Sequence, residues 1–133
     1  MSKAQVYEEF IGKTITKIEQ ISKQDLYFDL SCGGVIKMYH SQECCEQVEL
    51  EDVCGEFSDL LDSPILMFES VSNKDEYTNG HDSCTWTFYK IATIKGSVTL
   101  RWFGGSNGWY SEEVNVSYYP DGYKYERISS EYN

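Results

Sequence analysis

The residue types best suited to chemistry gather in one stretch of the chain, residues 40–66. This stretch contains one histidine and three of the five cysteines. It also holds eight carboxylates between Glu43 and Asp62, with no lysine or arginine. Two kinds of site fit that composition: a metal or nucleophile site built on the sulfurs, or an acidic surface that binds a partner.

A zinc site is the first alternative. Four residues of the types that zinc prefers are His40, Cys44, Cys45 and Cys54. Structural zinc sites usually take ligand pairs two to four residues apart, whereas adjacent cysteines on a strand point to opposite faces. His81 with Cys84 is a second half-site. The simpler interpretation is that Cys44 packs as a small apolar side chain. We therefore expect no cofactor, and a zinc-stabilised domain remains an alternative.

The sequence does not favour catalysis. A nucleophilic cysteine needs a base within reach and cationic surroundings that stabilise the thiolate. Cys45 instead lies among Glu43, Glu46 and Glu49, whose negative charge disfavours a thiolate. The chain has no glycine-rich phosphate loop after a strand, no HExxH motif and no GxSxG motif. We therefore expect a protein that is not an enzyme.

Charge restricts the partners. The 133 residues carry a formal net charge of -11, which repels nucleic acid and membrane surfaces and favours basic partners. The chain has two arginines, Arg101 and Arg127, so it lacks the basic stripe of a nucleic-acid-binding protein. No apolar run approaches the ~20 residues of a membrane span, and charges stand where a signal peptide is apolar. We expect a cytoplasmic protein whose cysteines stay as thiols.

An acidic face for a protein partner is the leading hypothesis. If residues 44–52 form a strand, Glu49 and Glu51 share a face about 6.6–6.8 Å apart, close to two base-pair steps of DNA. The array could then imitate phosphates towards a basic groove. The residues predicted to bind the partner are Glu46, Glu49, Glu51, Asp52, Glu56, Asp59 and Asp62. The simpler interpretation is an edge strand whose charges prevent aggregation.

A pocket for a small ligand is the other alternative. Such a protein would sequester a nucleotide signal in an aromatic pocket near the loops predicted at 72–83 and 104–108. The ligand-binding residues would be Arg101, Trp109 and Tyr110, with arginine or a lysine contacting phosphate.

The elements that must position these residues are mostly strands. Alternation, apolar runs and β-branched residues predict strands at residues 14–21, 25–31, 35–40, 44–52, 65–71, 84–93, 97–103 and 110–118. Residues 14–21 also fit a helix, since Ile15, Ile18 and Ile21 have helical spacing, and their β-branched residues favour the strand. Helical spacing predicts short helices at residues 3–11 and 57–61. The fold class is therefore α+β and mostly β: a single curved antiparallel sheet or meander with one or two short helices. The chain is expected to form one domain over residues 1–133.

The turn between the strands at 84–93 and 97–103 sets their register. A three-residue loop over 94–96 pairs Phe88 with Trp102, so that the apolar faces of the two strands agree. This loop requires Gly96 in the left-handed conformation.

Two blocks of sequence resemble a known family. The first, residues 40–66, has the skeleton H-x3-CCE, ED, G, DL and PIL, and the second begins WTFYKIATIKG at Trp86. Together they resemble an uncharacterised family of small single-domain proteins found largely in bacteriophages and prophages, over residues 12–118. These motifs mark the family and are silent about chemistry, so no activity carries over from it. By association, a phage origin favours a non-enzymatic protein of the host cytoplasm that binds and inhibits a host or defence protein, as anti-CRISPR proteins do. The sequence also leaves a homodimer open. The tyrosine-rich tail, 119–133, looks particular to this chain.

Overall fold

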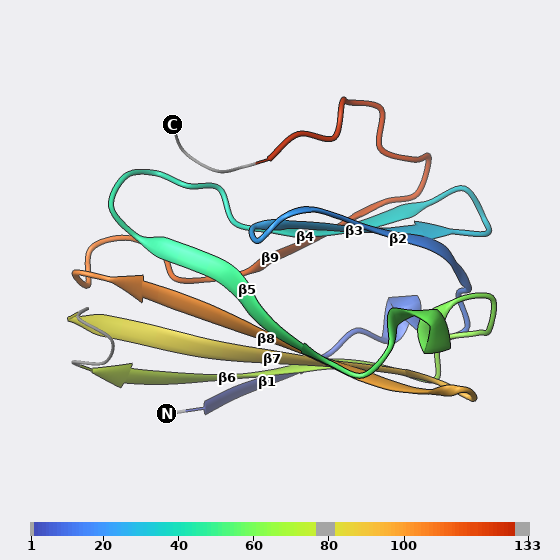
Figure 1. The fold of residues 1–133 in the computed structure, drawn as a ribbon, viewed down its shortest axis with the longest axis horizontal. Coiled ribbons are helices and arrows are strands. Elements are labelled where there is room, and N and C mark those ends of the chain that lie inside the picture. Colours follow the sequence, from blue (N-terminus) through green and yellow to red (C-terminus); the bar gives the residue numbers. More distant parts are fainter. Residues whose placement is uncertain (1, 77–81, 130–133) are drawn as a thin grey trace.

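The chain forms two antiparallel sheets that lie face to face (Figure 1). This computed structural model describes residues 2–76 and 82–129. One sheet has five strands in the order β1-β6-β7-β8-β5, and the other has four in the order β2-β3-β4-β9. The prediction of a mostly β protein is confirmed. The single curved sheet is wrong, because the strands divide between two layers.

Nine strands and two short 3-10 helices make up the described part of the chain. The five-stranded sheet consists of β1 (Ser2–Val6), β6 (Met67–Glu76), β7 (Ser83–Thr93), β8 (Gly96–Ser106) and β5 (Gln47–Cys54). The four-stranded sheet consists of β2 (Ile15–Ser22), β3 (Asp25–Leu30), β4 (Val35–Tyr39) and β9 (Asn115–Tyr119). The helices are η1 (Glu8–Phe10) and η2 (Phe57–Leu60).

The core lies between the two sheets. From the four-stranded sheet it takes alternate residues, Leu26, Phe28, Leu30, Ile36 and Met38. From the five-stranded sheet it takes Val48, Leu50, Phe68, Tyr89, Ile91, Val98, Leu100 and Trp102. Each sheet alone would leave one apolar face in water, and stacking the two faces buries both.

The N-terminal segment is a strand and not the helix expected at residues 3–11. β1 pairs with β6, with Val6 opposite Glu69. Val6 is 58% exposed and Phe10 is 1% exposed, so the two do not share a buried face. Pairing with β6 satisfies the backbone of this segment, and that tertiary effect outweighs a four-residue spacing that also fits a helix.

The β7–β8 hairpin has a two-residue turn at residues 94–95, so the predicted three-residue loop is wrong. Gly96 has a φ of 158°, close to extended backbone. Ile91 lies opposite Val98, and both are fully buried. Phe88, expected in the core, therefore lies on the outer face. Both faces of β7 carry large apolar residues, so alternation along the sequence did not determine which face of β7 points to the core.

β6 is longer than the strand expected at 65–71, and it takes up part of the loop expected at 72–83. At this end, β6, β7 and β8 reach beyond the four-stranded sheet (Figure 1). The inner face there carries polar side chains, because no second apolar layer covers it.

The tyrosine-rich tail packs on the four-stranded sheet. Arg127 Nη1 donates hydrogen bonds to Glu19 Oε1 at 2.7 Å and to Asp29 Oδ2 at 3.0 Å. Its guanidinium also lies 4.6 Å from the centre of the Tyr27 ring. Lys37 Nζ lies 5.1 Å from the ring centre of Tyr123. The tail is thus held to the sheet by ion pairs and cation–π contacts.

Arg127→Ala tests this attachment. Losing charge-assisted hydrogen bonds to two carboxylates should lower the free energy of unfolding by about 1–3 kcal/mol. Chemical denaturation measures the change, with Lys124→Ala as a control, since Lys124 is exposed in the same tail. Wild-type stability of Arg127→Ala would show that the ion pairs of Arg127 do not stabilise the fold.

Candidate functional site

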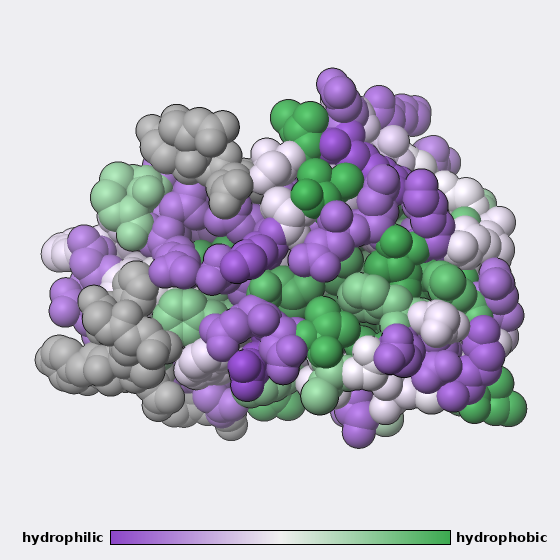
Figure 2. Space-filling view, viewed as in Figure 1, coloured by the Kyte–Doolittle hydropathy of each residue, from purple (hydrophilic) through white to green (hydrophobic). Residues whose placement is uncertain are grey.

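β5 is an edge of the five-stranded sheet and carries much of the predicted binding surface. Six of the seven predicted residues are exposed or half-buried on β5 and around η2: Glu49, Glu51, Asp52, Glu56, Asp59 and Asp62. These six residues are called the acidic edge below. Figure 2 shows this side of the molecule, where hydrophilic residues surround a hydrophobic area between the two sheets. The structure therefore places six of the seven along β5 and around η2.

A register shift interrupts the acidic edge. The pairing of β5 with β8 shifts between Leu50 and Asp52, as in a β-bulge. Glu51 Oε1 accepts a hydrogen bond from Arg101 Nη2 at 3.1 Å, which balances part of its charge. The regular phosphate-like spacing expected for Glu49 and Glu51 does not continue through the bulge, because the bulge breaks the two-residue alternation.

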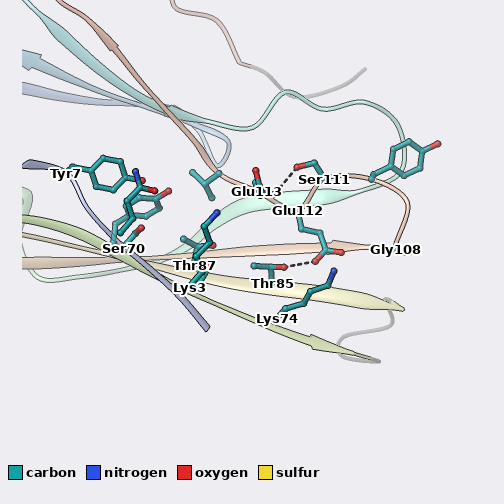
Figure 3. A pocket seen from close by; sticks show the side chains of 15 residues that line it. Lys3, Tyr7, Ser70, Lys74, Thr85, Thr87, Gly108, Ser111, Glu112 and Glu113 are labelled. Atoms are coloured by element: carbon teal, nitrogen blue, oxygen red, sulfur yellow. Dashed lines mark hydrogen bonds between the residues drawn. The ribbon is translucent and has the colours of Figure 1, made fainter. Parts of the chain in front are cut away.

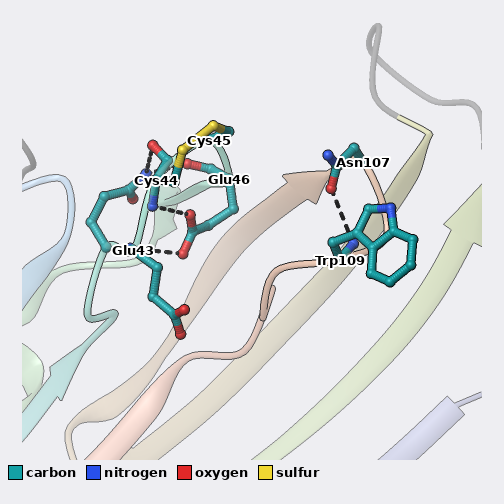
Figure 4. The surroundings of a disulfide bond; sticks show 7 residues. Glu43, Cys44, Cys45, Glu46, Asn107 and Trp109 are labelled. Carbon is teal, nitrogen blue, oxygen red and sulfur yellow. Dashed lines mark hydrogen bonds between the residues drawn. A yellow bond between two sulfur atoms is a disulfide. The ribbon is translucent and has the colours of Figure 1, made fainter.

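Glu46, the seventh predicted residue, is not on this surface, since it is 3% exposed. Its Oε2 accepts hydrogen bonds from His40 Nε2 at 2.9 Å and from the Glu43 N–H at 3.0 Å. Its Oε1 accepts one from the Cys44 N–H at 3.0 Å (Figure 4). His40 Nδ1 lies 2.8 Å from the carbonyl oxygen of Glu113. Both ring nitrogens of His40 therefore have hydrogen-bond partners.

These contacts make Glu46 a structural carboxylate. Burial raises the pKa of Glu46, but hydrogen bonds from the Cys44 N–H, from His40 and from the Glu43 N–H outweigh it and lower the pKa to about 2. The ionised side chain thereby joins the connection between β4 and β5 to the segment that leads into β9. The sequence could not distinguish Glu46 from its exposed acidic neighbours, because this distinction depends on His40.

Cys44 and Cys45 form a disulfide between neighbouring residues (Figure 4). The disulfide contradicts the thiols expected at these two positions, whereas Cys32, Cys54 and Cys84 are free. Cys44 is exposed, so its expected core position is wrong. Val48 and Leu50 are buried as predicted, but the inward position nearest the loop belongs to Glu46.

The structure does not assemble the alternative zinc site. His40 uses both ring nitrogens in hydrogen bonds, and Cys54 is exposed at the end of β5. Within residues 2–76 and 82–129 no three His, Cys, Asp or Glu side chains form a group that could hold a metal ion. Cys84 is buried, and His81, its expected partner in a half-site, lies outside the described residues.

A concave site, called the cleft below, lies over β1, β6 and β7 (Figure 3). The cleft has a volume of about 400 Å³, within the range of small-molecule sites. Strand register arranges its floor in three cross-strand rows: Gln5, Ser70 and Tyr89; then Lys3, Ser72 and Thr87; then Lys74 and Thr85. Further across the sheet, the same face carries the core residues Leu100 and Trp102. The face thus changes from apolar to polar where the second sheet ends.

The segment after β8 forms the opposite wall of the cleft. Glu112 is 8% exposed, and its carboxylate accepts hydrogen bonds from Thr85 Oγ1 at 2.8 Å and from Ser106 Oγ. Gly104 allows this wall to lie on the sheet, because a Cβ atom there would come within 2.5 Å of the Glu112 carbonyl oxygen. A glycine is therefore needed for the close approach of the two segments.

The sequence identified this cleft only in part. Tyr110 lines it as predicted. Arg101 lies instead 5.4 Å from the Trp86 ring, on the outer face of the sheet, and Trp109 is 86% exposed and outside the lining. The lysines of the cleft, Lys3 and Lys74, were missed. Their signal was the polar alternation of β1 and β6, which the assignment of these segments to a helix and a loop concealed.

Fold and sites define a mostly β, two-sheet domain with an acidic edge and a polar cleft. The chain belongs to the family described as a domain of unknown function, DUF7448, whose model matches residues 8–116. No curated protein matches the chain, and neither does any solved structure. The resemblance to an uncharacterised family is thereby confirmed. Within the described residues, no helix is long and apolar enough to cross a membrane.

Glu46→Gln tests the buried pair through pH. The pKa of about 2 in the folded protein lies below the ordinary value of 4.5, so ionised Glu46 stabilises the fold above about pH 4.5. That contribution, roughly 3 kcal/mol, is lost as pH falls from 4.5 towards 2. The variant should be destabilised near neutral pH, and the difference from the wild type in free energy of unfolding should shrink in acid. A pH-independent difference would contradict the assignment.

Gly104→Ala tests the wall of the cleft. The added methyl group must displace the Glu112 backbone, which should cost about 1–3 kcal/mol of unfolding free energy. Gly104→Ser, being larger, should cost at least as much in the same denaturation experiment. Wild-type stability of both variants would show that the wall does not lie on β8.

Proposed function

We propose that this protein is a non-catalytic binding protein whose acidic edge engages a basic surface of another protein. The observation that carries the proposal is the gathering of six carboxylates on one sheet edge and the adjoining η2 turn. Exposed carboxylates at an interface raise the association rate with a basic partner and repel acidic ones.

The partner class we propose is a host or defence protein whose basic surface holds nucleic acid. Occupying such a surface would inhibit the partner, in the manner of an anti-defence or anti-CRISPR protein of a bacteriophage. The bulge at Leu50–Asp52 makes competition by negative charge a better explanation than a copy of phosphate spacing. A homodimer formed through this edge is disfavoured, because it would bring like charges together.

A purely protective role is the competing explanation. Charged residues on an edge strand also prevent pairing with strands of other molecules. The two explanations differ in one respect, because a protective edge needs no particular partner and tolerates either sign of charge.

Reversing the charge of the acidic edge distinguishes partner binding from a protective role. The variant Asp52→Lys, Glu56→Lys, Asp62→Lys changes three exposed residues of the acidic edge. Tagged protein should retain a basic nucleic-acid-binding protein from bacterial lysate at about 50 mM salt and release it near 500 mM, because salt screens exposed charges. The variant should retain none, as judged by mass spectrometry.

The matched control is Glu8→Lys, Glu9→Lys, Glu126→Lys, which makes the same change of net charge at other exposed positions. This control should capture the partner as the wild type does. Equal capture by the edge variant would contradict the proposal and favour a protective role.

A further inference from the structure

Two lysines line the polar cleft. Lys3 on β1 lies opposite Ser72 on β6, and Lys74 is two residues further along β6. Such diagonal neighbours on one face have Cα atoms about 7–8 Å apart. Two long side chains at that separation can contact the same ligand group. Both line the same concave site (Figure 3). In a chain with a net charge of -11, this arrangement is a local cationic site.

Hydroxyl groups lie between the lysines and the core. Ser70 and Thr87 are 8% and 7% exposed, and Ser72 lies between them on the floor. Burial raises the pKa of Tyr89, and Tyr7 and Glu113 raise it further. The phenol therefore stays protonated. The floor presents hydrogen-bonding groups that suit a hydroxylated ligand.

The opposite wall differs in charge. The carboxylate of Glu112 already accepts two hydroxyl hydrogen bonds and lies buried in the wall. Glu113 is exposed and lines the cleft, so its carboxylate can accept hydrogen bonds from a ligand. The cleft thus has a cationic end at β1 and β6 and an acceptor end at residues 112–113.

We propose that this cleft binds a phosphate monoester of a polyhydroxylated small molecule, a sugar phosphate or a nucleotide. The phosphate lies between Lys3 and Lys74, and ligand hydroxyls reach Ser72, Thr87 and Glu113. Ammonium groups form strong charge-assisted hydrogen bonds with phosphate oxygens, and serine and threonine both donate to and accept from hydroxyls. A volume of about 400 Å³ suits a molecule of this size, whereas inorganic phosphate would leave Glu113 without a role.

This inference goes beyond the proposed function and uses a different surface. The cleft lies over β1, β6 and β7, and the acidic edge follows β5 at the opposite edge of the sheet. A ligand in the cleft therefore leaves the acidic edge open.

Calorimetric titration of the full chain tests the proposal. The probes are inorganic phosphate, ribose, ribose 5-phosphate, adenosine and adenosine monophosphate. The proposal expects the phosphate esters to bind at least about tenfold more tightly than ribose or adenosine, since only they offer charge-assisted bonds to the lysines. Preference for ribose 5-phosphate identifies a sugar phosphate, and preference for the monophosphate identifies a nucleotide. No binding of either ester, or equal binding of ester and parent, overturns the proposal.

Lysine variants locate the site. Lys3→Gln and Lys74→Gln should each weaken ester binding about tenfold. Lys90→Gln removes the same charge from an exposed lysine on the outer face, opposite Glu69, and should leave the affinity unchanged. Equal weakening by all three overturns the site. The variant with Asp52, Glu56 and Asp62 reversed should bind the ester at least as tightly as the wild type, which separates this test from that of the acidic edge.

Discussion

The structure depends on burying one face of each sheet against the other. Leu26, Phe28 and Met38 from one layer meet Ile91 and Trp102 from the other, and these residues are at most 1% exposed. Apolar contact holds only as far as the four-stranded sheet extends. Beyond it, the inner face of β6 and β7 turns to serine, threonine and lysine. The end of one layer thus determines where a cleft can form.

A second constraint is the buried hydrogen bond between His40 and Glu46. It lies in the loop that carries the chain from one sheet to the other, and His40 also contacts the carbonyl oxygen of Glu113. Burying a carboxylate is costly, and the hydrogen bonds from the backbone at 43–44 offset that cost. This contact connects the start of β5 with the wall segment of the cleft.

The two candidate sites lie at opposite edges of the five-stranded sheet, and their charges differ. β5 presents carboxylates, and β1 with β6 presents two lysines. The net charge of -11 agrees in sign with the acidic edge but conceals the two lysines at the other edge. This segregation of charge is the basis of both proposals: the carboxylates of β5 suit a basic macromolecule, and the lysines of β1 and β6 suit an anionic small molecule.

Much of the architecture follows from local pattern. Alternation in β3 and β8 was sufficient because each has one clearly apolar face, whereas β-branched residues indicated β2. The exposed acids of β5 follow from a strand that carries acids on its water-facing side. Tertiary structure alone decided the rest. It made β1 a strand by pairing it with β6, and it chose the inner face of β7 between two apolar faces. It also buried Glu46 by bringing His40 beside it. Each of these outcomes depends on a partner distant in sequence, and spacing along one segment carries no information about that partner.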